Sequence, residues 1–274
     1  PGVGALVLAP SRGLALQIAE AAERLCAYHA VRPVALVGGT QRGRDKRALG
    51  QRGASLVVAT PGRLLDHAEE NAGVPALLQS VGLLVLDECD VLLKDHADAV
   101  QEVLRHLRHD QLQMVLVSAT VSPDVQDLVA RVCKPGYCVL DCAADGPTAP
   151  DAIEQEYVVC PPMLLFTALV NAIAEEATVR PLAAKVIVFF PTARLAAFCA
   201  QLFRSSVKQR PYELHSRCDA AARLLAQREF GACTSGVLFT SRVSERGMDF
   251  PGVSLVVQVL APGSCEEYVH RVGR

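Results

Sequence analysis

The stretch Leu83-Leu-Val-Leu-Asp-Glu-Cys-Asp90 decides the fold of this chain. Its four apolar residues follow Gly82 and predict a short, fully buried strand that ends at three carboxylates. Carboxylates directly after a core strand lie at the carboxyl edge of an α/β sheet, where such folds bind ligands. There Asp87 can hold a hydrated Mg²⁺ through oxygen contacts, and Glu88 can orient or deprotonate a water. An acidic turn is the simpler alternative, and these residues alone do not separate the two.

Two further apolar stretches end in polar residues in the same way. Met114-Val-Leu-Val-Ser-Ala-Thr120 follows the first stretch, and Leu56-Val-Val-Ala-Thr-Pro-Gly-Arg63 precedes it. In the latter, Thr60 and Pro61 predict a helix start, with threonine as the N-cap and proline at the first helical position. A helix N-terminus beside Gly62 would offer a site for an anion.

Together with the segment Tyr268-Val-His-Arg-Val-Gly-Arg274, these stretches resemble the DEAD-box family of ATP-dependent RNA helicases, members of superfamily 2. Any one motif is weak, but nine motifs stand in family order over essentially the whole chain. The nine are Pro10-Ser-Arg-Gly-Leu-Ala15, Gly38-Gly39, Thr60-Pro-Gly-Arg63, Asp87-Glu-Cys-Asp90, Ser118-Ala-Thr120, Val188-Phe-Phe-Pro-Thr192, Leu214-His-Ser216, Thr240 through Asp249, and His270 through Arg274.

The resemblance implies three groups of site residues, with ATP and Mg²⁺ as cofactors and RNA as the partner. The nucleotide group is Asp87 (on Mg²⁺, through water), Glu88, Asp249 (on the ribose), Arg271 and Arg274. The group on RNA, mainly on its backbone, is Arg12, Gly38, Gly39, Thr60, Gly62, Arg63, Arg223 and Thr240. The group that couples hydrolysis to strand separation is Asp90, Ser118, Thr120 and His270.

Several of these residues also have plain structural interpretations. Arg12 can be a solvated arginine at a helix start, and Ser118 and Thr120 can cap a strand end. An isolated histidine such as His270 is more often structural. The basic run from Gln41 to Arg47 can be a solvated face or part of the RNA track.

Length and composition narrow the class of protein. With 274 residues, 51% of them hydrophobic, the chain can build two medium domains with their own cores. Its formal net charge of −2 gives no global signature of nucleic-acid binding, so any such surface must be a local patch. Ten cysteines without a C-x-x-C pair predict reduced thiols in an intracellular protein. We expect no targeting peptide and no membrane partner, because no apolar run approaches the roughly twenty residues of a membrane span.

Strands and helices alternate through both halves of the chain. In the first half we expect strands at residues 5–9, 34–37, 56–59, 83–86 and 114–117, and helices from Ser11 to about Tyr28, from about Ala97 to His109, and over 121–132. In the second half we expect strands at 155–160, 186–190, 212–214, 237–240 and 255–260, and helices over 163–176, 192–204, 219–230 and from Ser264. Strands separated by helices require parallel pairing with right-handed crossovers.

The expected fold is therefore α/β, with two tandem RecA-like doubly wound domains. Residues 141–150 collect Gly, Pro and small residues and predict a linker. We expect a helicase ATP-binding domain at 1–143, a linker at 144–152 and a helicase C-terminal domain at 153–274. By resemblance the first domain is truncated at its N-terminus and the second at its last motif.

The chain also departs from the family pattern. Gly13 replaces Glu, Ala220 replaces Gln, Arg242 replaces Asp, Glu245 replaces a small residue and Cys89 replaces Ala. No G-x-x-x-x-G-K-[ST] occurs, and no adenine-reading Gln segment precedes the first strand, although the family places both upstream. We expect a fragment of an ATP-dependent RNA helicase that does not hydrolyse ATP by itself. The alternative is a non-catalytic RNA-binding or scaffold protein that keeps the helicase fold.

Overall fold

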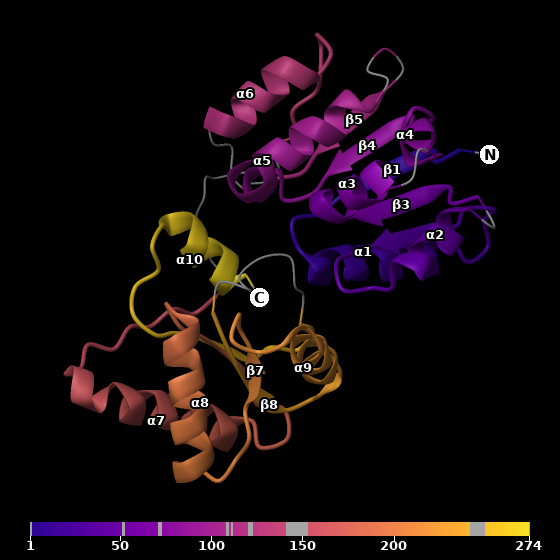
Figure 1. Cartoon of the computed structure of the whole chain (residues 1–274). Helices are drawn as coiled ribbons and strands as arrows, with labels where there is room; N and C mark the ends of the chain where they lie inside the picture. Colours follow the sequence, from indigo (N-terminus) through magenta and orange to yellow (C-terminus); the bar gives the residue numbers. More distant parts are fainter. Residues whose placement is uncertain are drawn as a thin grey trace. The chain divides into compact units, whose positions relative to one another are not determined.

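The chain forms two compact units, residues 1–141 and 142–274 (Figure 1). The structure, a computed structural model, describes residues 2–50, 53–70, 73–107, 110, 112–119, 123–140, 153–241 and 250–273. Each unit contains one parallel sheet with helices packed on it, so the predicted pair of doubly wound α/β domains is confirmed. The expected linker lies outside the described residues, and the expected domain limits at 143 and 153 stay a prediction.

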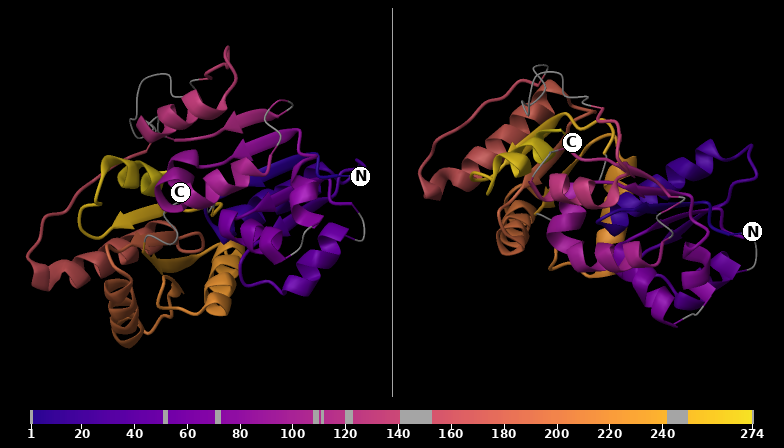
Figure 2. Two further views of the ribbon diagram at one scale, coloured as in Figure 1. Left: turned by 45° about the horizontal axis from the view of Figure 1, so that its top comes forward. Right: turned by 90° about the horizontal axis from the view of Figure 1, so that it is seen from above.

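Unit 1 is built on five parallel strands in the order β2-β3-β1-β4-β5. They are β1 (Ala5–Leu8), β2 (Pro33–Leu36), β3 (Leu56–Ala59), β4 (Leu83–Leu86) and β5 (Gln113–Leu116). The register places the last residue of each strand opposite the last residue of its neighbour. The strand arrows point the same way in Figure 2. The loops that follow all five strands therefore start at one level, the carboxyl edge of the sheet.

Helices pack against both faces of this sheet because successive side chains of a strand alternate between faces. Leu6 and Leu8 belong to the core shared with α3 and α5, whereas Val7 packs against the residues of α1 on the other face. The helices of unit 1 are α1 (Arg12–Leu25), α2 (Arg42–Gly50), α3 (Pro61–Glu70), α4 (Gly73–Leu78), α5 (Cys89–Arg105) and α6 (Pro123–Val132).

Three helices of unit 1 differ from the expected pattern. The sequence analysis missed α2 and α4; α2 is strongly polar and buries only Asp45 and Leu49. The expected start of α5 at Ala97 is wrong, because the helix begins at Cys89. Glu88 has a left-handed backbone (φ 49°) and turns the chain directly from β4 into α5. A non-helical residue, His96 (φ −139°), then interrupts the apolar periodicity.

Unit 2 holds four parallel strands in the order β7-β8-β6-β9. Figure 1 shows α8 and α9 on opposite sides of β7 and β8. In agreement, the buried residues of α7 and α8 belong to one hydrophobic core, and Phe230 of α9 belongs to a second core. The elements are η1 (Pro162–Leu164), α7 (Leu165–Val179), β6 (Lys185–Phe189), α8 (Ala193–Ser206), β7 (Tyr212–Leu214), α9 (Ala220–Ala232), β8 (Gly236–Thr240), β9 (Leu255–Gln258) and α10 (Cys265–Val272).

Polar side chains cap the starts of three helices in unit 2. The side chains of Thr192, Asp219 and Ser264 accept hydrogen bonds from the backbone N–H groups three residues on, at 3.1, 2.7 and 3.2 Å. Polar caps of this kind satisfy N–H groups that have no partner within the helix. The predicted starts of α8, α9 and α10 are thereby confirmed.

The strand expected at Gln155–Cys160 is wrong. Tyr157 and Val159 are 90% and 88% exposed, and no strand among the described residues pairs with this segment. An apolar, β-branched run forms a strand only where a neighbouring strand accepts its hydrogen bonds. The adjoining helical stretch, Pro162–Val179, is long and apolar enough by composition alone to cross a membrane. Here Leu169 and Ile173 of this stretch are buried in the core of unit 2.

A buried lysine in unit 2 yields the first testable prediction. Lys185 is 1% exposed, and its ammonium group donates to the carbonyl oxygens of Gly231 (3.2 Å) and Pro251 (2.9 Å) while lying 5.1 Å from the centre of the Phe230 ring. We expect Lys185→Ala to lower the free energy of unfolding by about 2–4 kcal/mol, because it leaves a cavity and two carbonyls without their donor.

Lys185→Met is the matched variant, since methionine restores much of the lost volume without the ammonium group. We expect it to cost about half as much as the alanine variant in urea unfolding followed by circular dichroism. Equal losses for both variants would show that packing contributes nothing and that the hydrogen bonds account for the whole effect.

Candidate functional site

Five loops with predicted site residues lie side by side at the carboxyl edge of the unit 1 sheet. Backbone hydrogen bonds continue past the strand ends and hold the loops together. In each, the N–H of a loop residue donates to the carbonyl oxygen at the end of the neighbouring strand: Thr60 to Leu36 (3.1 Å), Ala9 to Ala59 (3.0 Å), Asp87 to Leu8 (3.0 Å) and Val117 to Leu86 (2.9 Å). In sheet order the loops carry Gly38 and Gly39, Thr60, Arg12, Asp87 and Glu88, and Ser118. The sequence motifs are thus neighbours in space.

The double-glycine loop after β2 lies against Arg12. A Cβ atom built on Gly38 would lie 3.3 Å from the Arg12 Nε, and one built on Gly39 would lie 2.9 Å from its Nη1. Gly39 also has φ +90°, which favours glycine. Arg12 is exposed on the first turn of α1, a turn held by the Ser11 hydroxyl accepting from the Leu14 N–H (3.2 Å). A guanidinium beside open backbone is a suitable arrangement for a phosphate group.

The loop after β3 opens α3 as expected, with Pro61 at the first helical position. The carbonyl of Thr60 accepts from the Leu64 N–H at 3.1 Å, which is the first hydrogen bond of the helix. Gly62 is exposed, and no described residue outside its own helix turn and chain neighbours lies within 4 Å of where its Cβ would be. The helix N-terminus is therefore open to an approaching anion at the same edge as the double-glycine loop.

Arg63, expected on an RNA phosphate, lies inside unit 1 and is only 7% exposed. Its guanidinium donates to the Asp45 Oδ2 from Nη2 (2.7 Å) and Nε (3.1 Å), and to the Thr40 carbonyl from Nη2 (2.8 Å). His67, one turn further on α3, has its Nε2 3.0 Å from the same Asp45 oxygen. This buried network ties Thr40, next to Gly39, to α2 and α3.

The network accounts for the charge state of Asp45. Burial raises the pKa of this carboxyl, but hydrogen bonds from His67, Arg63 and Thr40 outweigh burial, so the pKa lies below its usual value. Sequence analysis missed the network, although the four-residue spacing of Arg63 and His67 puts both on one side of α3. The phosphate contact of Arg63 stays a prediction, and its burial favours a positioning role.

The carboxylates after β4 are held at the start of α5. The backbone N–H of Glu88 donates to the Asp87 Oδ1 at 3.0 Å, and burial raises the pKa of Asp87. Glu88 has the left-handed backbone described above, a strained conformation that is enriched at functional sites. Cys89 is fully buried; burial raises its pKa, and it hydrogen-bonds Ser118 of the neighbouring loop. Asp90 lies in the first turn of α5.

The donor set at this edge suits Mg²⁺. In the part of the chain that the structure describes, no group of three or more His, Cys, Asp or Glu side chains could cage a metal. Mg²⁺ usually keeps several waters and takes one or two protein carboxylates together with substrate phosphates. Asp87, a half-buried carboxylate, fits that pattern.

The predicted residues of unit 2 are mostly held inside it. Thr240 is fully buried, and its hydroxyl donates to the Leu214 carbonyl at 2.6 Å, which ties the ends of β8 and β7. Arg271 is 2% exposed, with its Nη2 3.6 Å from the Glu267 Oε2 and its guanidinium 5.4 Å from the centre of the Phe189 ring. His270 is buried, and Arg223 is half-buried on α9.

Five of the candidate site residues and family departures lie outside the described residues. They are Thr120, Arg242, Glu245, Asp249 and Arg274. The expected role of Thr120 in coupling, and the expected roles of Asp249 and Arg274 on the nucleotide, therefore stay predictions.

Sequence comparisons match the chain to known families over most of its length. The model for "DEAD/DEAH box helicase" matches residues 1–128, and the model for "Helicase conserved C-terminal domain" matches residues 169–274. The DEAD-box ATP-dependent RNA helicase 26 of Oryza sativa subsp. japonica is 36% identical over 281 residues, covering 100% of this chain and 51% of the relative. The ATP-dependent RNA helicase has1 of Neosartorya fischeri is 33% identical, covering 100% and 43%. The chain spans about half the length of these relatives.

Solved structures give the same result. The DEAD-box helicase Mss116 bound to ssRNA and UDP-BeF superimposes with a TM-score of 0.88 at 28% identity, covering 100% of this chain and 57% of that one. Dbp5 of S. cerevisiae bound to RNA and ADP BeF3 superimposes with a TM-score of 0.84 at 27% identity, covering 100% and 68%.

Proposed function

Because the chain belongs to the DEAD-box family of superfamily 2 helicases, we propose that it is part of an ATP-dependent RNA helicase. In this proposal RNA-stimulated ATP hydrolysis is coupled to local separation of RNA strands or remodelling of RNA–protein complexes. The relatives are named as ATP-dependent RNA helicases, and two similar structures hold RNA together with a nucleotide analogue. One relative, from Aspergillus oryzae, is named as mitochondrial, in keeping with a location inside the cell.

The observation that carries the proposal is the division of the carboxyl edge of the unit 1 sheet. On the β2, β3 and β1 side it offers Arg12, the Gly38–Gly39 loop and the α3 N-terminus, all suited to phosphates. On the β4 and β5 side it offers Asp87, Glu88 and the Ser118 hydroxyl. One edge thus presents a polyanion track next to a carboxylate centre, which is what coupling RNA binding to phosphoryl chemistry requires.

Within the carboxylate centre each residue has a separate task. Asp87 would hold Mg²⁺ through water, and the ion would neutralise charge on the transferred phosphate. Glu88 orients the attacking water and accepts its proton. By family resemblance, Arg271 and Arg274 close on the nucleotide, with Arg274 near the γ-phosphate, and Asp249 contacts the ribose. Asp90, Ser118, Thr120 and His270 transmit the state of the nucleotide to the RNA track.

RNA is bound through its backbone in this proposal. Gly38, Gly39 and Gly62 offer backbone groups, Thr60 offers its hydroxyl and Arg12 its guanidinium, and Arg223 and Thr240 contribute from unit 2. Arg63 acts from inside by fixing Thr40 and the start of α3. Since phosphates carry no sequence information, binding should be tolerant of base sequence and sensitive to salt.

A non-catalytic RNA-binding or scaffold protein is the second candidate. It is favoured by the departures from the family pattern at Gly13, Ala220 and Arg242. Displacement of a short RNA duplex by the complete product of the gene separates the two candidates. The helicase displaces the strand in ATP and fails to do so in its absence. A scaffold binds the RNA and displaces nothing under either condition.

The RNA track yields a second prediction. We expect Arg12→Gln in the 274-residue chain to weaken binding of single-stranded RNA and to flatten the slope of log affinity against log salt by about 0.7, the value for one lost phosphate contact. Fluorescence anisotropy across a salt series measures both. Arg24, the basic residue in the last turn of the same helix, provides the control, Arg24→Gln. Equal slopes for the Arg12 variant and the unchanged chain would remove Arg12 from the track.

A further inference from the structure

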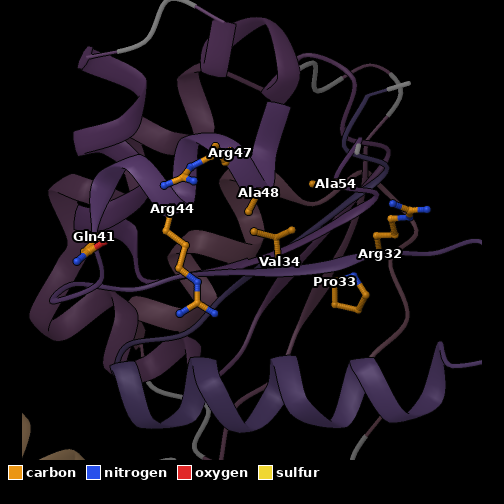
Figure 3. A pocket seen from close by; sticks show the side chains of 8 residues that line it. All are labelled: Arg32, Pro33, Val34, Gln41, Arg44, Arg47, Ala48 and Ala54. Carbon is orange, nitrogen blue, oxygen red and sulfur yellow. The ribbon is translucent and has the colours of Figure 1, made fainter. Parts of the chain in front are cut away.

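A hollow of about 740 Å³ lies beside β2, the edge strand of the unit 1 sheet (Figure 3). One wall of the hollow comes from α2 and the residue before it, and consists of Gln41, Arg44, Arg47 and Ala48. The other wall comes from β2 and the flanking loops, and consists of Arg32, Pro33, Val34 and Ala54. Figure 3 shows three guanidinium groups placed around the side chains of Val34 and Ala48. We call it the β2 arginine hollow.

The basic residues of α2 divide into two sets by their partners. Arg42 pairs with Glu70 and lies 3.9 Å from Asp66, and Lys46 lies 4.0 Å from Glu70, so one side of the helix is neutralised by α3. The carboxylate of Asp45 is taken up by Arg63. By contrast, no carboxylate oxygen of the described residues lies within 4.0 Å of the guanidinium groups that line the hollow, those of Arg32, Arg44 and Arg47.

Among the described residues no carboxylate compensates the charge of the hollow, and its three arginines are all exposed. Guanidinium groups bind phosphates through paired hydrogen bonds, and their planes also stack on bases. The apolar floor of Pro33, Val34, Ala48 and Ala54 can carry the face of a ribose or base. An anion with both phosphate and flat apolar parts matches this lining better than a simple ion does.

The position of the hollow points to the same ligand. Gln41 lies on its wall and follows directly after the Gly38–Thr40 loop of the proposed RNA track. A strand of RNA leaving that loop can thus continue into the hollow. An added peptide strand is disfavoured at this edge, because β2 begins with Pro33, which has no N–H, and is flanked by arginines.

We propose that the β2 arginine hollow binds the phosphates of a single-stranded RNA segment that extends beyond the Gly38–Gly39 loop. This rests on the proposed function, since it lengthens the same track. Arg44 and Arg47 bind the phosphates, and Arg32 closes the far end. The segment is held mainly through its phosphates, which carry no sequence information, so binding should depend little on base sequence.

RNA length separates this extension from the track itself. The 274-residue chain is titrated by fluorescence anisotropy with single strands of about 6 and about 20 nucleotides, one near the lower end of common single-strand site sizes and one beyond their upper end. We expect Arg44→Gln with Arg47→Gln to weaken binding of the longer RNA on the order of tenfold or more. Its salt slope should flatten by about 1.4, two phosphate contacts, while binding of the shorter RNA stays unchanged.

The matched control is Arg42→Gln with Lys46→Gln, which removes the same formal charge from the paired side of the same helix. Circular dichroism and urea unfolding of both double variants verify that α2 stays folded. Equal weakening by the two double variants, or no effect of the first on the longer RNA, would overturn the proposal.

Two other outcomes locate a failure. If the unchanged chain binds neither RNA, the proposed function fails and the hollow with it. A glutamate-rich peptide serves as the competing ligand. If this peptide binds the unchanged chain but not the Arg44 and Arg47 double variant, while the longer RNA binds both equally well, then the hollow binds an acidic protein segment and the RNA proposal is wrong.

Discussion

Replacing Glu88 by Gln in the complete product of the gene is expected to lower the rate of RNA-stimulated ATP hydrolysis by about 10²- to 10⁴-fold. Glu88 follows β4 directly, next to Asp87, at the edge of the sheet where the proposed nucleotide centre lies. Glutamine keeps the size of the side chain but cannot accept the proton of the attacking water. Phosphate release at saturating RNA measures the rate.

The same position offers a control for folding. Glu88 has φ 49°, so Glu88→Gly relieves an unfavourable backbone conformation while also removing the carboxylate. We expect the glycine variant to lose hydrolysis to the same extent without losing free energy of unfolding. RNA affinity should stay unchanged in both variants, since the RNA track lies on the β2, β3 and β1 side of the edge. A glutamine variant that keeps roughly a tenth or more of the original rate would exclude Glu88 as the base.

Replacing Arg63 by Ala is expected to lower the free energy of unfolding of the 274-residue chain by about 3–5 kcal/mol at neutral pH. Arg63 is 7% exposed and Asp45 is 3% exposed, so the substitution leaves a buried carboxylate without its main partner. The chain has no tryptophan, so urea unfolding followed by circular dichroism is the suitable measurement.

An exposed ion pair on the neighbouring surface provides the comparison. Arg42, whose side chain is 53% exposed, pairs with Glu70, and Arg42→Ala should cost only about 0–1 kcal/mol. Adding Asp45→Asn to Arg63→Ala should recover part of the loss, because the uncompensated charge is then gone. If Arg63→Ala costs no more than Arg42→Ala, then the buried network does not hold α2 and α3 together.

The pH dependence of this network has a defined sign. The pKa of Asp45 lies below its usual value in the folded chain, so its contribution to stability is present above the ordinary carboxyl pKa. That contribution is lost as the pH falls through the lowered folded pKa. The difference in unfolding free energy between the unchanged chain and Arg63→Ala should therefore shrink as the solution is acidified, and a difference that grew instead would contradict the assignment of the charge to Asp45.

The fold could be predicted from sequence because its strands are short, buried and apolar. Stretches such as Leu83–Leu86 end at charged residues, which marks both the strand and its carboxyl edge. The strand expected at Gln155–Cys160 failed because an apolar pattern does not reveal whether a partner strand exists. Helix α2 was missed because it buries little apolar surface, so its position depends on tertiary ion pairs.

The candidate site was predictable in its location and less so in its details. Motifs that follow parallel strands must meet at one edge, and Arg12, Gly39 and Asp87 do so. Arg63 was expected at the surface, because a motif does not tell whether an arginine meets a ligand or a buried carboxylate. Only the folded position of Asp45 on α2, a helix that the sequence analysis missed, decides that.

ATP hydrolysis by the complete product of the gene, with and without single-stranded RNA, tests the proposed helicase function most directly. We predict hydrolysis that rises on addition of RNA and that disappears in the Glu88→Gln variant. The 274-residue chain by itself, which contains no G-x-x-x-x-G-K-[ST] segment, should bind RNA without hydrolysing ATP. If the complete product binds RNA and unfolds cooperatively but does not hydrolyse ATP, the proposed enzymatic function is wrong. The protein would then be an RNA-binding scaffold with a helicase fold.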